Sequence, residues 1–238
     1  MSEAMRGGAS PRWHVVAADE LRRLVRAARR SGTAHALRIL RDRVEDRIAE
    51  RRLGFGSAGL IPIETLIPQW RDCHDYFPST ISHFRRLLDA LAIGPRDVFV
   101  DYGAGKGRTL ALAAEYPFAR MIGVEIAPAL VAAARANLRR AVPAPRFAAI
   151  ELWEGNARDY RLPAGATVLY VYNPFHGAVL RAVLADIRRT LRAAPRRMTV
   201  VMNNPRHFLP IAHEYPWLRC VRSFQFEYEC RVYEAEAV

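Results

Sequence analysis

The alternation of apolar runs and helical patterns in the middle of the chain constrains its fold more than any other feature. Short apolar runs predict five strands, at residues 98–102, 120–126, within 147–153, at 167–172 and at 198–202. Helical patterns lie between them, at residues 108–114, 128–140 and about 178–193. Strands that alternate with helices form a parallel sheet with right-handed crossovers, so we expect an α/β fold. Two further strands, predicted at residues 218–224 and 227–234, would form a C-terminal hairpin.

The N-terminal part of the chain has a different pattern. The segments Ala17–Arg30 and Ala36–Arg51 carry apolar residues at helical spacing and predict a pair of amphipathic helices. Prolines and turn residues follow, which places a boundary near residues 55–75. We therefore expect a helical N-terminal extension over residues 1–70 and an α/β domain over residues 71–238.

The charge of the chain leaves two interpretations open. The formal net charge is +12, and such a balance is typical of proteins that bind nucleic acid or another acidic partner. Of the 36 basic residues, however, 35 are arginine, and they are scattered among acidic residues. The codon bias of a GC-rich genome produces the same composition, so nucleic acid is an alternative partner and not the favoured one.

The sequence carries no signal for a membrane or for secretion. No apolar run approaches the roughly 20 residues of a membrane helix, and the N-terminus lacks the pattern of a signal peptide. The three cysteines, Cys73, Cys220 and Cys230, form no C-x-x-C pair and are expected to be reduced thiols. These features predict a cytoplasmic protein.

The stretch D-Y-G-A-G-K-G-R, residues 101–108, follows the first predicted strand and is a candidate ligand-binding loop. The phosphate-binding loop of nucleoside triphosphatases requires G-x-x-x-x-G-K followed by Ser or Thr. With Gly105 and Lys106 as its G-K, the first glycine would fall on Val100 and the hydroxyl on Gly107. Both requirements fail, so this type of site is excluded.

The dinucleotide fingerprint, G-x-G-x-x-G, also fits poorly. Gly103 and Gly105 match its first half, but the third glycine would fall on Arg108. The carboxylate of Asp101, two residues before the first glycine, would repel a pyrophosphate above the loop. A ligand with a cationic group is favoured, and S-adenosylmethionine carries an ammonium and a sulfonium but no phosphate.

Glu125 closes the second predicted strand, 24 residues after Asp101, where an acidic side chain meets ribose hydroxyls in Rossmann-like sites. With the glycine loop and Glu125 taken together, the sequence resembles the class I S-adenosylmethionine-dependent methyltransferases over about residues 97–205. The first motif of that family, an acid followed by x-G-x-G-x-G, matches Asp101, Gly103, Gly105 and Gly107. The resemblance implies a Rossmann-like methyltransferase fold with a mostly parallel seven-stranded sheet, an antiparallel C-terminal hairpin, and S-adenosyl-L-methionine as cofactor. The alternative is a Rossmann-like domain without a ligand.

The resemblance also implies roles for the donor-site residues. In the family, the first acid holds the methionine amino group, the glycines let the backbone approach the donor, and the second-strand acid binds the ribose hydroxyls. An acid and a small residue after the third strand usually contact the adenine, and the matching pair here is Asn156 and Ala157. Asn156 replaces the usual Asp, although its amide oxygen can still accept from the adenine amino group. Asp159 is a competing candidate.

Two further features belong to the expected donor site. Lys106 is the only lysine of the chain, and its ammonium could pair with the donor carboxylate or with an acidic neighbour, unless arginine is simply too bulky there. The turn D-Y-F-P-S-T precedes a helix that is expected to run to about Leu91, with Ser79 or Thr80 as its cap. Related enzymes with an added N-terminal region use a loop at this place to cover the donor, a role that would fall to Tyr76 and Thr80. The alternative is an ordinary turn and helix cap.

The segment Y-N-P-F-H, residues 172–176, closes the fourth predicted strand and is expected to face the donor's methyl group. It resembles the Asp/Asn-Pro-Pro-aromatic motif of methyltransferases that act on amino groups, without the second proline. The resemblance implies that Asn173 and the Pro174 carbonyl accept hydrogen bonds from the target nitrogen, and that Phe175 packs on the substrate. The alternative is an Asn-Pro turn that ends a strand. His176 is a conceivable base, or starts a helix without a chemical role.

The expected function is in-line methyl transfer to a nitrogen, on a protein lysine or another amine, without a metal ion. The chain looks like small bacterial methyltransferases that carry D-Y-G-x-G-K-G-R and N-P-F, and it is more distantly similar to lysine methyltransferases with a Rossmann-like core. Two alternatives stay open. One is a small-molecule O-methyltransferase, and the other is a non-catalytic donor-binding or RNA-binding module whose basic N-terminal helices form the contact surface.

Overall fold

The computed structural model describes residues 25, 29, 32–68 and 71–236, and the chain divides into two units, Met1–Val44 and Glu45–Val238. Helix α2 (Thr33–Leu53) begins in the first unit and ends in the second, and it confirms the helix predicted over Ala36–Arg51. Most of the helix predicted over Ala17–Arg30 lies outside the described residues. The boundary expected after residue 70 stays a prediction.

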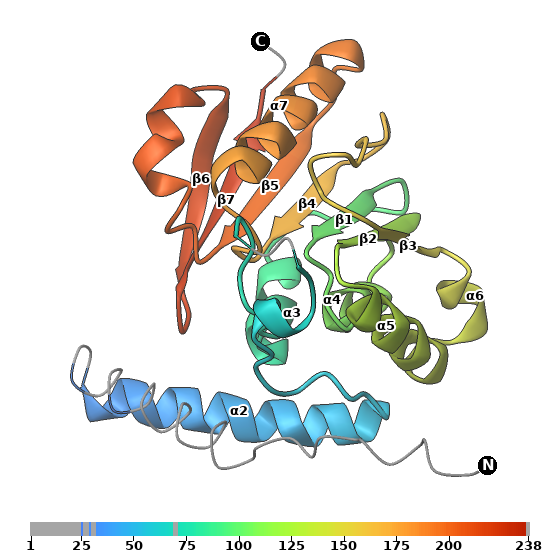
Figure 1. The fold of residues 1–238 in the computed structure, drawn as a ribbon, viewed down its shortest axis with the longest axis vertical. Coiled ribbons are helices and arrows are strands. Elements are labelled where there is room, and N and C mark those ends of the chain that lie inside the picture. The colour runs from blue at the N-terminus through green and yellow to red at the C-terminus, as the bar shows by residue number, and fades with distance from the viewer. Residues whose placement is uncertain (1–24, 26–28, 30–31, 69–70, 237–238) are drawn as a thin grey trace. The chain divides into compact units, whose positions relative to one another are not determined.

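The second unit is built on a seven-stranded sheet in the order β3-β2-β1-β4-β5-β7-β6 (Figure 1). Five parallel strands match those predicted: β1 (Val98–Tyr102), β2 (Arg120–Glu125), β3 (Ile150–Glu154), β4 (Val168–Val171) and β5 (Met198–Asn203). The predicted C-terminal hairpin consists of β6 (Leu218–Gln225) and β7 (Glu229–Ala235), and β7 pairs antiparallel with β5. The Rossmann-like methyltransferase fold expected from the sequence is therefore confirmed.

Helices connect the strands close to the predicted positions. They are α3 (Ile81–Asp89), α4 (Arg108–Ala113), α5 (Pro128–Ala141) and α7 (Gly177–Ala193). Three short helices were not predicted: η1 (Ile63–Thr65), α6 (Ala144–Phe147) and η2 (Leu209–Glu214). Segments this short contain too few apolar positions to show a helical period. Among the residues that the structure describes, none of the helices combines the length and the apolar character needed to cross a bilayer.

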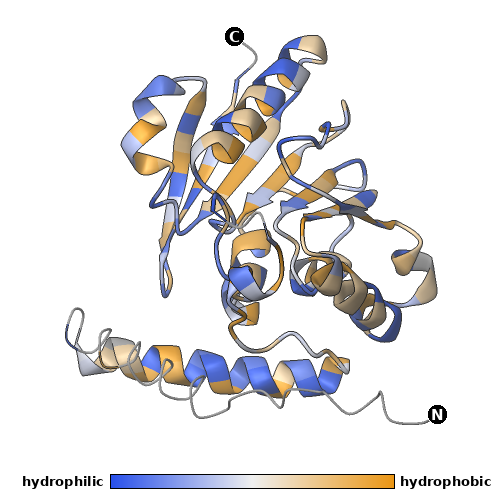
Figure 2. Ribbon diagram, in the orientation of Figure 1, coloured by the Kyte–Doolittle hydropathy of each residue, from blue (hydrophilic) through white to orange (hydrophobic). Residues whose placement is uncertain are grey.

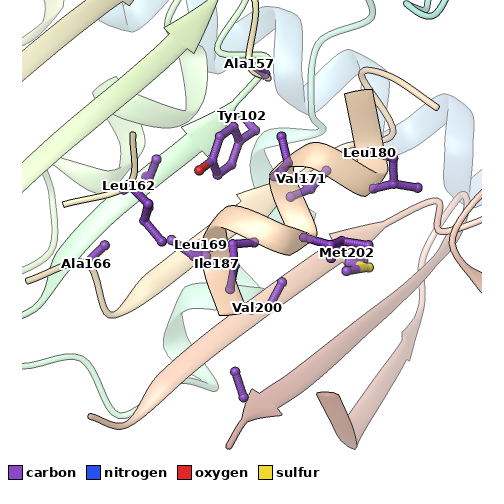
Figure 3. Close-up of a cluster of buried hydrophobic side chains, with 14 of the residues drawn as sticks. Tyr102, Ala157, Leu162, Ala166, Leu169, Val171, Leu180, Ile187, Val200 and Met202 are labelled. Atoms are coloured by element: carbon purple, nitrogen blue, oxygen red, sulfur yellow. The ribbon is translucent and has the colours of Figure 1, made fainter. Parts of the chain in front are cut away.

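The strands of the sheet contribute side chains to two hydrophobic layers. In one layer, Leu169 and Val171 of β4 and Val200 and Met202 of β5 pack with Leu180 of α7 (Figure 3). Alternate residues of the same strands join the other layer with α3 and α4, as expected from the period of two in a strand. Both strands are therefore buried on both sides, and Figure 2 shows them as mostly hydrophobic.

Helix α3 begins at the predicted position, but another residue supplies its capping hydrogen bond. Thr80 occupies the N-cap position but makes no side-chain capping hydrogen bond, and Ser79 Oγ lies 2.9 Å from Tyr170 Oη. The Asp46 carboxylate of α2 accepts instead from the Ile81 N–H at 2.9 Å. The predicted N-cap position of Thr80 is therefore confirmed, but the side-chain acceptor is Asp46, which is distant in the sequence and is brought there only by the fold.

Candidate active site

A pocket lies at the carboxyl ends of β1, β2 and β4, where open α/β sheets bind their ligands. The strand ends, the glycine loop and the segment before α3 all contribute to its lining. The predicted site residues that line it are Tyr76, Asp101, Gly103, Glu125, Asn156, Ala157, Pro174 and Phe175. The predicted residues that lie outside its lining are Thr80, Gly105, Lys106, Gly107 and Asn173.

Two glycines let other elements approach the backbone of the loop closely. Gly103 and Gly105 have φ angles of +88° and +55°, a left-handed conformation that strains residues with a Cβ. A Cβ on Gly103 would lie 2.5 Å from Pro174 Cβ, and one on Gly105 would lie 2.4 Å from Tyr76 Cε2. The glycines therefore let the N-P-F turn and the Tyr76 ring rest directly on the loop.

Asp101 lies in β1 at the wall of the pocket and is only 2% exposed. The Thr109 hydroxyl donates a hydrogen bond to its carboxylate. Burial is the main cause that raises the pKa of Asp101 to about 7. The hydrogen bond from Thr109 opposes this increase, and the negative charge of Glu125 adds to it. Burial therefore disfavours the ionised form of this carboxyl group, and a cation beside it would stabilise that form.

Glu125 ends β2, and its carboxylate holds two backbone segments in place. Oε2 accepts from the Gly105 N–H at 2.8 Å, and Oε1 accepts from the N–H of Ala127, the N-cap of α5, at 2.9 Å. Burial raises the pKa of Glu125, while these hydrogen bonds oppose the increase. Each carboxylate oxygen keeps a second lone pair, so the group can still accept from hydroxyls of a ligand.

These two carboxyl groups fit the expected cofactor. Neither Asp101 nor Glu125 forms an ion pair within the described part of the chain, although both are almost fully buried. An ionised carboxylate in such surroundings is unfavourable until a cation or further hydrogen-bond donors reach it. S-adenosylmethionine would bring an ammonium for the first group and ribose hydroxyls for the second.

Residues Asp72–Phe77, here called the strap, run beside the N-P-F turn and pair with it. The His74 N–H donates to the Pro174 carbonyl at 2.9 Å, and the His176 N–H donates to the Asp72 carbonyl at 3.0 Å. An isolated antiparallel bridge joins Cys73 and Phe175 between them. The Pro174 carbonyl, predicted to accept from the substrate, thus accepts one backbone hydrogen bond already and keeps one lone pair.

Tyr76 connects the strap to the glycine loop. Its ring rests on Gly105, its hydroxyl donates to the Ser57 carbonyl at 2.7 Å, and Lys106 Nζ lies 5.1 Å from its ring centroid. Burial lowers the pKa of Lys106, whereas an ammonium is attracted to the aromatic face. The structure thus gives Lys106 a contact that sequence analysis missed, and its pairing with the donor carboxylate stays a prediction.

Arg108 lines the pocket as well, and sequence analysis assigned it no role. Its guanidinium donates to the carboxylates of Asp46 at 2.9 Å and Glu50 at 2.7 Å, both on α2. It also donates to Ser57 Oγ at 2.8 Å and to the Ser79 carbonyl at 2.7 Å. This set of contacts, here called the Arg108 clamp, joins the end of α2 and the turn before α3 to the glycine loop. The only sequence signal for this role was the arginine at the end of D-Y-G-x-G-K-G-R. No sequence pattern shows which residues it contacts, because its partners lie 29 to 62 residues earlier in the chain.

The N-P-F turn lies at the edge of the pocket. Asn173 has a φ of +44°, a left-handed conformation that asparagine tolerates better than most residues. Its side chain is half-buried. Phe175 is 6% exposed, and its ring packs against Tyr102 with the centroids 6.4 Å apart. Tyr172, which was not predicted, also lines the pocket and is more exposed than Phe175.

Asn156 follows β3 and lines the pocket, whereas the competing Asp159 does not. The Asn156 side-chain oxygen accepts from the Arg158 N–H at 3.1 Å, which fixes the amide at the start of a turn. Asp159 is exposed and lies 3.9 Å from the guanidinium of Arg158. Of the two candidates for the adenine contact, only Asn156 therefore lies where the pocket is.

Comparisons with known proteins add to this geometry. Residues 99–194 match the family model of a methyltransferase domain. A geranyl diphosphate C-methyltransferase from Streptomyces coelicolor A3(2) is 13% identical, with 67% of this chain and 76% of that chain covered and a TM-score of 0.51. A SAM-dependent methyltransferase from Aquifex aeolicus is 13% identical, with 68% and 100% covered and a TM-score of 0.50. An RNA methyltransferase from Salinibacter ruber is 22% identical, with 68% and 94% covered and a TM-score of 0.48. The structures with TM-scores of 0.51 and 0.50 share the fold of this chain. No curated protein matches the sequence.

Proposed function

Residues 99–194 match the model of a methyltransferase domain, and from this premise we propose that the protein is a class I S-adenosylmethionine-dependent methyltransferase that methylates a nitrogen. The favoured acceptor is an amine, on a protein lysine or on another molecule. The observation that carries the proposal is the position of the N-P-F turn, which rests on Gly103 of the donor loop and borders the pocket at the end of β4.

In this proposal the two buried carboxyl groups bind the donor. Asp101 receives the ammonium and Glu125 receives the ribose hydroxyls, while Asn156 and Ala157 lie beside the adenine. Tyr76 keeps the glycine loop and the strap together at the side of the site. The burial of both acids supports these assignments, as does their lack of a cationic partner among the residues that the structure describes.

The chain's contribution to catalysis is chiefly positioning. When bound, the donor supplies a methyl group on a sulfonium, which leaves as a neutral thioether after in-line transfer. The Asn173 side-chain oxygen and the free lone pair of the Pro174 carbonyl accept from the N–H groups of a neutral amine and so direct its lone pair toward the methyl group. The amine must be neutral to react, and the methylated product gains a positive charge that it loses as a proton to water.

A substitution series at Asn173 tests this role. Asn173→Ala should lower turnover roughly 100-fold, because the acceptor loses its orientation, while the donor's dissociation constant stays nearly unchanged. Asn173→Asp should keep most of the activity because it retains an acceptor oxygen. Asn204→Ala is the matched control, since Asn204 has a similar left-handed φ of +53° but belongs to the segment after β5 and not to the N-P-F turn. Radiolabelled transfer to a fractionated bacterial lysate, with calorimetry for the donor, measures both quantities.

The chemical identity of the methylated atom decides between the proposal and its alternatives. Hydrolysis and mass spectrometry of the labelled fraction should place the methyl group on nitrogen. A methyl group on oxygen or carbon would contradict the proposed acceptor. RNA binding that weakens with salt, without any transfer, would support the non-catalytic module instead.

A further inference from the structure

Three histidines from separate segments meet beside the N-P-F turn. His74 belongs to the strap, His176 is the N-cap of α7, and His207 lies between β5 and η2. Their ring centroids are 5.1 Å apart for His74 and His176, 4.8 Å for His74 and His207, and 5.0 Å for His176 and His207. Within the described ranges, no three His, Cys, Asp or Glu side chains are arranged to hold a metal ion, so the cluster needs another explanation.

His74 is the member of the cluster that lines the pocket. Its backbone N–H bonds to the Pro174 carbonyl, so the ring is anchored directly beside the proposed acceptor site. Its Nε2 atom is buried and has no hydrogen-bond partner among the residues that the structure describes. A buried polar atom in this state loses its hydration without compensation, and a ligand that bonds to it recovers that free energy.

The surroundings keep this imidazole neutral. Burial is the main cause that lowers the pKa of His74 to about 4, and His207, Arg206 and His176 act in the same direction, whereas Asp75 opposes them. Burial and Arg206 lower the pKa of His207 as well, and its Nε2 lies 3.0 Å from Arg206 Nε. Asp72 Oδ1 faces His176 Nδ1 at 4.0 Å. A neutral imidazole always has one nitrogen that accepts a hydrogen bond.

We propose that His74 binds the methyl acceptor, with Nε2 accepting a hydrogen bond from the acceptor's N–H. The inference rests on the proposed nitrogen target and deepens it. Asn173 and Pro174 would hold the amine from the N-P-F turn, and His74 would hold it from the strap. The positive charge of Arg206 at the edge of the cluster disfavours a second cation, so the same arrangement selects the neutral, reactive form of the amine.

Two substitutions separate the hydrogen bond from the shape of the ring. His74→Phe keeps a planar ring but has no acceptor, whereas His74→Gln places an amide oxygen near the position of Nε2. With n-butylamine as a lysine side-chain analogue, the release of S-adenosylhomocysteine should fall roughly tenfold in kcat/KM for His74→Phe and less than threefold for His74→Gln. Donor affinity and Tm should stay at wild-type values in both variants, and in the exposed control His213→Gln. Equal activity of His74→Phe and wild type would overturn the inference. A drop in the donor affinity or Tm of His74→Phe large enough to explain its loss of activity would overturn it as well.

A second readout does not depend on turnover. Long-range ¹H–¹⁵N NMR of the histidine rings should show His74 neutral at pH 6 to 7 and titrating near its lowered pKa of about 4. Arg206→Gln should move that titration to higher pH, because one neighbouring cation is removed. In the enzyme saturated with S-adenosylhomocysteine, added n-butylamine should shift the His74 Nε2 resonance and leave His213 unchanged. An unchanged His74 resonance at millimolar n-butylamine would overturn the inference.

The outcomes also separate this inference from the proposed function. A wild-type enzyme that methylates only oxygen or carbon contradicts the nitrogen target, whatever the His74 variants do. A wild-type enzyme that methylates n-butylamine and loses nothing with His74→Phe contradicts the role of His74 alone.

Discussion

Single residues of the site owe their chemistry to where the fold buries them. Asp101 is an ordinary aspartate in the sequence, and its type and position were enough to predict a cationic ligand. Its raised pKa of about 7 was not predictable, because burial and the nearby charge of Glu125 arise only in the folded chain. His74 and Arg108 were missed for the same reason, since their partners come from distant segments.

The raised pKa of Asp101 predicts a pH-dependent donor affinity. In the proposed assignment the donor's ammonium binds the Asp101 carboxylate, so below pH 7 binding must first remove a proton from Asp101. We expect the dissociation constant for S-adenosylhomocysteine, measured by calorimetry, to rise by up to about tenfold per pH unit as the pH falls from 7 to 5.5. Asp101→Asn should bind more weakly and lose this dependence, whereas Asp159→Asn, an exposed control, should keep it. A flat profile in the wild type would contradict the assignment of the ammonium to Asp101.

At the scale of elements, strands and long helices followed from the apolar periods of the sequence. Seven strands and the helices α3, α4, α5 and α7 were predicted close to their observed ends because each contains enough buried positions to show its period. The capping acceptor of α3 could not be predicted, because Asp46 belongs to another helix. Contacts between distant elements leave no local pattern in the sequence. The Arg108 clamp is the clearest example of such contacts in this chain.

The Arg108 clamp should be far more important for stability than a surface ion pair. Arg108→Met leaves the buried Glu50 and the half-buried Asp46 without their cation and should lower the free energy of unfolding by about 3–5 kcal/mol. The matched control is Arg85→Met, since Arg85 pairs with Glu115 at 2.7 Å with both side chains well exposed, and it should cost less than about 1 kcal/mol. Urea denaturation of both variants makes the comparison. If Arg108→Met does not fold, Arg108→Lys, which retains the charge but not the fork of donors, should give an intermediate loss. Equal losses for Arg108 and Arg85 variants would show that the clamp is not structural.

At the scale of the whole molecule, the division between the two units predicts where the chain can be shortened. A fragment of residues 45–238 keeps every partner of Arg108, whereas a fragment of residues 71–238 lacks Asp46, Glu50 and Ser57. The longer fragment should bind S-adenosylhomocysteine like the full chain and melt within a few degrees of it. The shorter fragment should melt at a lower temperature and bind weakly, because a buried guanidinium is left unpaired. A shorter fragment as stable as the longer one would favour the boundary after residue 70.

The single lysine in contact with Tyr76 has a practical consequence for chemical labelling. Apart from the N-terminus, the chain offers amine-directed reagents one primary amine, and it lies in the glycine loop. A change in the mass of the intact protein therefore reports modification at one of two known amines, the N-terminus or Lys106. It also simplifies the search for substrates, because self-methylation of a lysine side chain would add mass at Lys106 and nowhere else.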